Sequence, residues 1–291
     1  MDPISKMMAA SGGSVDTSWQ IANASWDSRT PSSLSLLAAT GQQPYNGTMA
    51  GNGLHFYTMR WRHYNSGFKT EVTQYNLSTA WDLSTASLDG FQTIGRTGGQ
   101  GVGVNYDGTK QYRLYSDGKL RQWSVSSSNA WDFQGNASYD GEVDLSSYGN
   151  NRSVAWSSDG SKMFYYTTKA DSNGNNNKRV KLFTASTNFD ALSTLTYSTQ
   201  SSILPSTYNS FAMKPDGTIM YFTDDSNAYI YQHNLGTAYD LSTLSTTADS
   251  TLDLTSDITS EGTQYITFEP NGEFFFTKSN KPHACINKIV I

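Results

Sequence analysis

The sequence predicts an all-β fold, a five-bladed β-propeller whose ring is closed by an N-terminal outer strand joined to C-terminal inner strands. Two short markers each recur five times along the chain, and each end of the chain carries an incomplete copy of the repeat. The composition agrees with β structure. Aromatic residues make up 13% of the 291 residues, and a chain of this length can form one large all-β domain.

The first marker is a turn dipeptide, Asn or Asp followed by Gly. It occurs at Asn52-Gly53, Asp107-Gly108, Asp159-Gly160, Asp216-Gly217 and Asn271-Gly272, so successive glycines are 55, 52, 57 and 55 residues apart. Such dipeptides supply the positive φ of a tight hairpin turn, and each one therefore predicts two antiparallel strands.

The residues around each turn support this interpretation. Four residues after each glycine stands an aromatic residue: Tyr57, Tyr112, Phe164, Tyr221 and Phe276. Positions four and six before each glycine are largely apolar, which is the period of 2 expected for a strand. We expect the repeated aromatic to lie in one buried layer of each blade.

The second marker is an aromatic residue followed by Asp. It occurs at Trp26-Asp27, Trp81-Asp82, Trp131-Asp132, Phe189-Asp190 and Tyr239-Asp240. A third strand precedes each of the last four copies, at 71–77, 119–125, 179–184 and 228–234, and a Ser/Thr-rich fourth strand follows. Since Asp at such a position caps a turn by accepting backbone N–H groups, we interpret the repeated Asp as structural and not as a ring of ligands.

The two ends of the chain predict how the ring closes. The chain opens with Trp26-Asp27, which has no hairpin before it, and ends with a third strand at 285–291, which has no marker after it. We expect the outer strand of the last blade to come from roughly residues 34–39. An open β-solenoid or two β-sandwiches would show similar strands and turns, but neither explains a repeat split between the termini.

Catalytic chemistry finds little support in the predicted inner strands, at 45–50, 101–106, 152–158, 208–214 and 263–269. Their only acidic residue is Glu269, beside a turn, which we interpret as a surface charge. Glycoside hydrolysis needs a pair of carboxylates. The sequence therefore predicts no catalytic residue and no enzyme, and a carbohydrate-binding propeller or glycosidase stays as the alternative.

Metal, cofactor and nucleic-acid sites are not predicted either. His55, His63, His233 and His283 lack the close spacing of metal ligands, and the Gly-rich run at 98–103 leads into a strand and not into a phosphate-binding helix. A net charge of −5 without a basic run argues against nucleic acid. No stretch has the roughly 20 apolar residues of a membrane span.

The fourth repeat carries a resemblance to a known group. Pro215-Asp216-Gly217-Thr218, Met220-Tyr221, the strand at 231–235 and the segment Thr237-Ala238-Tyr239-Asp240-Leu241-Ser242-Thr243 resemble propeller repeats of structural proteins of marine bacteriophages. The resemblance covers residues 24 to 291, and the opening Met1-Asp2-Pro3-Ile4-Ser5-Lys6-Met7-Met8 is similar to the start of many virion proteins of marine myoviruses and podoviruses. Blades two and three depart from it, with Tyr106 and Ser158 in place of the turn proline.

This resemblance implies a virion structural protein of the tail, neck or capsid, used for host-surface adsorption or as a decoration or adaptor. We expect residues 1–18 to form a docking peptide and residues 19–291 the propeller. Ile4, Met7 and Met8 would share one face of a short helix and bind another virion protein. A disordered end is the alternative for this peptide. A host-surface glycan or protein would be a further partner.

Overall fold

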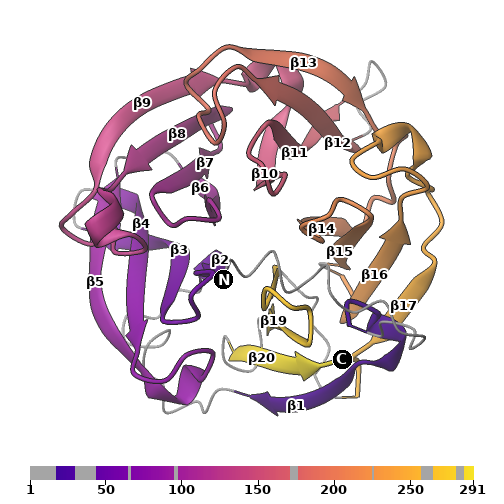
Figure 1. Cartoon of the computed structure of the whole chain (residues 1–291), viewed down its shortest axis with the longest axis horizontal. Coiled ribbons are helices and arrows are strands. Elements are labelled where there is room, and N and C mark those ends of the chain that lie inside the picture. Colours follow the sequence, from indigo (N-terminus) through magenta and orange to yellow (C-terminus); the bar gives the residue numbers. More distant parts are fainter. Residues whose placement is uncertain are drawn as a thin grey trace.

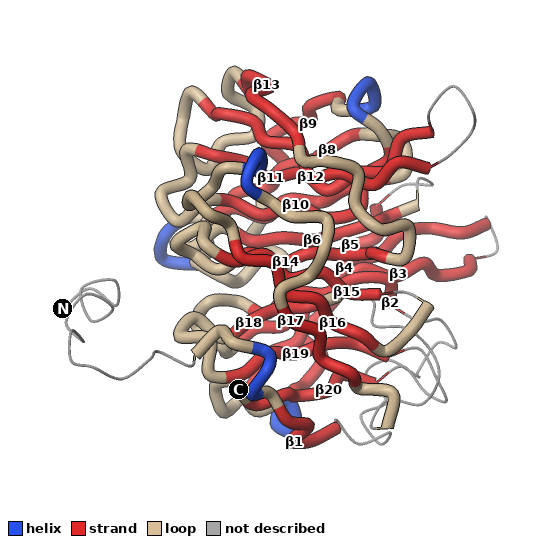
Figure 2. Tube along the Cα trace, turned by 90° about the vertical axis from the view of Figure 1, so that its right-hand side faces the viewer, coloured by secondary structure: helices blue, strands red, loops and turns tan. Residues whose placement is uncertain are grey.

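The computed structural model describes residues 18–29, 44–64, 67–94, 98–170, 176–224, 226–256, 265–279 and 285–291. Five four-stranded antiparallel sheets are arranged as blades around a central axis (Figure 1). Seen from the side, the strands run across the thickness of the ring, from one face to the other (Figure 2). The predicted five-bladed β-propeller is confirmed.

Blades I to IV are each formed by four consecutive strands, ordered from the axis outwards. Blade I contains β2 (Pro44–Met49), β3 (His55–Tyr64), β4 (Gly67–Leu77) and β5 (Ala86–Ile94). Blade II contains β6 (Gly99–Val104), β7 (Lys110–Tyr115), β8 (Lys119–Ser124) and β9 (Ser138–Asp144). Blade III contains β10 (Asn150–Trp156), β11 (Lys162–Ala170), β12 (Asn176–Ala185) and β13 (Leu195–Gln200). Blade IV contains β14 (Tyr208–Met213), β15 (Ile219–Asp224), β16 (Tyr229–Asn234) and β17 (Ser250–Asp253).

Blade V joins the two ends of the chain, as the split repeat predicted. Its inner strands are β18 (Ile266–Phe268), β19 (Phe274–Ser279) and β20 (Cys285–Val290), and its outer strand is the N-terminal β1 (Ser25–Arg29). β1 pairs antiparallel with β20, starting at Ser25 opposite Val290. The ring is thereby closed by backbone hydrogen bonds between segments far apart in the sequence.

The predicted position of this outer strand was wrong, because the fifth aromatic marker is Trp19 and not Trp26. Trp19 shares the positive φ of the other four marker aromatics, at 68°, and its N–H donates to the carbonyl of Gly272 as Trp81 does to Gly53. Gln20 replaces the expected Asp, so Trp19 does not match the aromatic-Asp pattern. The segment 34–39 lies outside the described residues.

The marker aromatics have a positive φ because each ring lies on a turn glycine of its own blade. A Cβ added to the turn glycine would come between 2.2 and 2.4 Å from that ring; the pairs are Gly53–Trp81, Gly108–Trp131, Gly160–Phe189, Gly217–Tyr239 and Gly272–Trp19. A bulky residue with φ above zero is strained, and tertiary packing must hold it. Glycine at the turn thus supplies both the positive φ and the room for the ring.

The Asp after the aromatic caps a turn, as predicted. Asp82 and Asp240 each accept a hydrogen bond from the backbone N–H two residues on, at Ser84 and Ser242, both at 2.9 Å. These two caps precede the short 3-10 helices η2 (Leu83–Thr85) and η5 (Leu241–Thr243). The remaining 3-10 helices are η1 (Ile21–Asn23), η3 (Ser127–Asn129) and η4 (Ser146–Tyr148). No helix in the described part of the chain has the length and apolar character of a membrane span.

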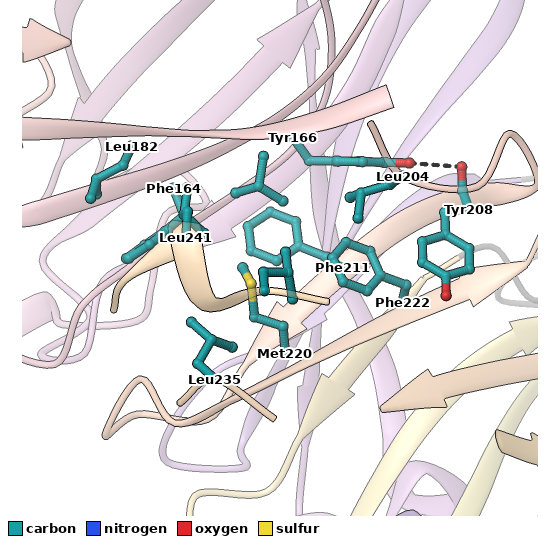
Figure 3. Packing of buried hydrophobic residues seen from close by; sticks show 12 residues of the cluster. Phe164, Tyr166, Leu182, Leu204, Tyr208, Phe211, Met220, Phe222, Leu235 and Leu241 are labelled. Atoms are coloured by element: carbon teal, nitrogen blue, oxygen red, sulfur yellow. Dashed lines mark hydrogen bonds between the residues drawn. The ribbon is translucent and has the colours of Figure 1, made fainter. Parts of the chain in front are cut away.

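The core lies between neighbouring blades, and the repeated aromatic after each hairpin is buried there. Tyr57, Tyr112, Phe164, Tyr221 and Phe276 are at most 1% exposed, which confirms the predicted layer. Figure 3 shows the layer between blades III and IV, in which Phe164 and Leu182 pack with Met220, Phe222 and Leu241.

Candidate functional site: the central channel

The innermost strands β2, β6, β10, β14 and β18 surround the axis of the ring (Figure 1). Each of them pairs with one neighbour only, so its other edge faces the channel. The N–H and C=O groups along such an edge have no strand partner, and some bond to side chains of a neighbouring inner strand: the N–H of Met49 donates to Thr267 Oγ1, and that of Phe211 to Ser153 Oγ. The channel is therefore lined by neutral backbone dipoles as well as by side chains.

The cavity inside this ring has a volume of about 200 Å³. Its described lining consists of small, apolar, aromatic and neutral polar side chains from all five inner strands, such as Thr48, Val102, Ala155, Met213 and Phe268. None of the described lining residues carries a carboxylate, an imidazole, an amine or a guanidinium. Tyr106 is the one side chain among these described residues of a type that acts as a general acid or base.

One mouth of the channel lies where the inner strands enter their hairpin turns. We call it the turn-side mouth; its residues are Gly51, Tyr106, Trp131, Pro215 and Pro270. Tyr106 occupies the turn position that proline holds in blades IV and V, and it is 47% exposed. Its ring meets that of Phe189 edge to face, with centroids 6.2 Å apart. The residues that line the mouth are thus aromatic, proline and glycine, and the charged pair Lys214–Asp216 adjoins them.

Glu269, the one acidic residue of the predicted inner strands, belongs to a turn. Its carboxylate accepts hydrogen bonds from Asn271, from the backbone N–H at 2.9 Å and from Nδ2 at 2.7 Å. The residue is 6% exposed, so its interpretation as a surface charge was wrong, and burial raises the pKa of the carboxyl. It does not line the described channel.

The histidines are far apart, as predicted, where the structure describes them. His233 is buried in blade IV, where Nε2 lies 2.8 Å from the Tyr208 hydroxyl, and burial lowers its pKa. His55 lies in blade I beside Asn52. The side chain of His63, and His283 as a whole, fall outside the description. Among the described residues, no cluster of three His, Cys, Asp or Glu side chains could hold a metal ion.

The remaining predicted positions have mixed outcomes. The Gly-rich run forms β6 and not a phosphate loop; Gly99 lies against Met59 of blade I, and Gly103 lines the channel. The expected docking residues Ile4, Met7 and Met8 lie outside the described residues.

Arg113 on β7 is a buried cation, 1% exposed, that was not predicted from the sequence. The signal was present in the repeat. Arg113 stands five residues after a turn glycine, where the other blades have Thr58, Tyr165, Phe222 and Thr277.

Comparison with known proteins shows similarity in fold and little in sequence. No family model matches the chain, and no curated protein matches it. Among solved structures, the β-propeller domain of Cps50 (Swd1) from Myceliophteria thermophila is 9% identical, with a TM-score of 0.45 over 86% of this chain and 83% of that one. A putative 6-phosphogluconolactonase from Bacteroides uniformis is 13% identical, with a TM-score of 0.48 over 86% and 68%. The periplasmic gluconolactonase PpgL of Pseudomonas aeruginosa is 10% identical, with a TM-score of 0.47 over 81% and 62%.

Proposed function

We propose that this chain is a bacteriophage virion structural protein that displays a rigid propeller, without catalytic activity, for adsorption to the host surface or as a tail or capsid decoration or adaptor. The observation that supports the non-enzymatic part is the channel, whose described lining holds no carboxylate, imidazole, amine, guanidinium or thiol that could act as a catalytic base or activate a hydroxyl. The virion assignment rests on the resemblance of the repeat.

Rigidity supports a display role. Blade V joins β1 to β20, so both ends of the ring are held by a strand ladder. A ring closed in this way holds its strands and the described turns between them in place, which suits an attachment surface because little conformational entropy is lost on binding.

The direct test is the location of the protein. An antiserum raised against the propeller should label intact, gradient-purified phage particles from a culture that encodes the chain, with gold visible by electron microscopy. Labelling of host material alone, with none on purified particles, would overturn the virion assignment.

The docking peptide is tested by incorporation. Replacing Ile4, Met7 and Met8 with Ser should leave a folded propeller that no longer enters particles, because the apolar face would be lost. The matched control replaces Ser5 and Lys6 with Ala and should enter particles normally. Equal incorporation of both variants would move the attachment surface onto the blades.

A carbohydrate-binding propeller is the second candidate, and the turn-side mouth favours it. Tyr106 is half exposed there beside the ring of Phe189, and neutral polar groups line the channel within. Aromatic faces with neutral hydrogen-bonding groups suit sugar rings. On a glycan array, Tyr106→Ala should lose any signal given by the wild type, whereas Tyr139→Ala, on the outer strand β9, should keep it. Sugar release from a bound glycan would instead reveal a glycosidase.

A further inference from the structure

A second, much smaller pocket, of about 10 Å³, lies between blades I and II. It is lined by Tyr57, Gln74 and Gln92 of blade I and by Gln111 and Arg113 of blade II, with Phe133 beside them. Cavities of this size hold about one water-sized particle. Buried polar side chains therefore surround a space large enough for about one water-sized molecule or ion.

Arg113 is a buried cation without an anionic partner in this cavity. Its Nε donates to Gln111 Oε1 at 2.6 Å, and its Nη2 donates to Gln92 Oε1 at 2.8 Å. The guanidinium carbon lies 3.8 Å from the centre of the Trp123 ring. These neutral partners disperse the charge and do not balance it.

The guanidinium stays charged at neutral pH. Burial lowers the pKa of Arg113 to about 10, opposed by the neighbouring Tyr115. This value is still far above 7, so the group cannot escape the cost of burial by losing its proton. A compensating negative charge is the remaining way to reduce that cost.

The carboxylates of this junction are engaged elsewhere. Asp89 and Asp132 both accept hydrogen bonds from Gln74 Nε2, each at 2.9 Å. Neither of them is hydrogen-bonded to Arg113, whose side-chain partners are the two glutamines and the neutral hydroxyl of Tyr115.

Two buried donors of the same cluster have no hydrogen-bond acceptor among the described residues. They are Nη1 of Arg113 and Nε2 of Gln111. Gln111 is fully buried and Arg113 is 1% exposed. A buried donor without an acceptor costs about 1–3 kcal/mol, and more when it is charged, so the site calls for an acceptor.

Blade II is unusual at these positions. Gln111 stands three residues after the turn glycine, where the other blades have apolar side chains: Phe56, Met163, Met220 and Phe275. Arg113 is likewise the one charged residue at its position in the repeat. Departures from a repeated apolar pattern are expected at functional sites, since they cost stability.

We propose that the cavity between blades I and II binds a monoatomic halide ion, chloride, between the guanidinium of Arg113 and the amide of Gln111. A single anion would balance the charge of the guanidinium and would also accept hydrogen bonds from both donors. A water molecule would satisfy the donors and leave the charge unbalanced. A tetrahedral oxyanion such as sulfate exceeds a space of about one water by far more than a single chloride ion does.

Thermal unfolding in matched salts tests the site. At constant ionic strength, replacing sodium gluconate by sodium chloride up to about 0.2 M should raise the Tm of the wild type by about 2–3 °C along a saturating curve. Arg113→Met should remove this chloride dependence, and its own residual salt response measures the non-specific effect. Arg179→Gln, whose guanidinium donates to the Ser201 carbonyl in blade III, should keep the full dependence.

A bromide-soaked crystal of the wild-type chain gives a readout independent of stability. We expect an anomalous peak within hydrogen-bond distance of both Arg113 Nη1 and Gln111 Nε2. Equal Tm in chloride and gluconate, or a crystal with no peak in this cavity, would overturn the proposal in favour of a buried water. The crystal decides the matter if the Arg113 variant fails to fold.

Discussion

The junction between blades I and II and the junction between blades III and IV solve the same packing problem with different chemistry. In the first, the Tyr57 hydroxyl donates to the carbonyl of Trp131. Gln74 donates to Asp132 at 2.9 Å and accepts from the N–H of Phe133 at 2.9 Å. A Tyr and a Gln on adjacent strands thus hold the marker turn of the next blade.

At the second junction, Phe164 and Leu182 occupy the same two positions. The Phe164 ring stacks on Tyr239, with centroids 6.0 Å apart, and Leu182 joins Leu241 in an apolar cluster (Figure 3). No hydroxyl and no amide reach across from these two positions.

Two of the other three junctions repeat the Tyr and Gln pair, and the third has different residues at both positions. Blades II and III use Tyr112 and Gln122, and blades IV and V use Tyr221 and Gln232. At the junction of blades V and I the pair is Phe276 and Lys288, and Lys288 contributes to lowering the pKa of Asp82. Tyr occurs with Gln, and Phe occurs without it. A buried aromatic side chain is common to every junction, and the Tyr hydroxyl and Gln amide are added to it at three of them.

Removing the buried aromatic side chain should have the largest effect on the free energy of unfolding. Tyr221→Ala and Phe164→Ala should each lower the free energy of unfolding by about 3–5 kcal/mol, because each leaves a cavity between blades. Tyr221→Ala should cost more, since it also leaves the Trp19 carbonyl without its donor. Urea unfolding measures both. A loss below about 1 kcal/mol in either variant would mean that the ring does not fill this layer.

Removing the amide of a polar junction should have the next largest effect. Gln232→Leu should cost about 1–3 kcal/mol, because the buried N–H of Ile21 would lose its acceptor. Lys288→Leu at the V/I junction is the matched control and should change stability by less than about 0.5 kcal/mol, since the Asp82 carboxylate on which its charge acts is exposed. Equal costs would show that the amide acts through packing alone.

Removing the Tyr hydroxyl at a polar junction, or adding one at the apolar junction, should change stability by a smaller amount. The two changes should have opposite signs. Tyr112→Phe should cost about 0.5–1.5 kcal/mol by removing the hydrogen bond to the Phe189 carbonyl. Phe164→Tyr adds a hydroxyl that can reach the carbonyl of Tyr239, and it should gain up to about 1 kcal/mol. Destabilisation by Phe164→Tyr would show that the apolar junction excludes a polar group.

The smallest expected effect is a pH dependence at the apolar junction. His233 lies beside Phe222, with ring centroids 5.4 Å apart, and burial lowers its pKa below the usual 6.5. The unfolded chain therefore binds the proton more readily, so stability should fall as the pH drops below 6.5. His233→Gln should make the decline of Tm with falling pH shallower. An unchanged slope would place the titration at another group, such as His55.

The blade repeat could be predicted because its information is local. The turn glycines, the aromatics of the buried layer and the capping Asp residues each act within a few residues of sequence, and all were identified correctly in blades I to IV. Blade V was partly wrong because Trp19-Gln20 departs from the local motif. What defines Trp19 as a marker is its contact with Gly272, at the opposite end of the chain.

The number of blades, the strands of blades I to IV and the joining of the two ends in one blade were predictable from the sequence alone. These follow from the spacing of turns and the alternation of side chains, which are properties of the chain. Only the tertiary structure decided the chemistry between blades. Whether Gln74 meets Asp132, or Arg113 is buried against two glutamines, depends on which faces the closed ring brings together. The uncharged lining of the channel was decided in the same way, because residues from all five blades converge there only after closure.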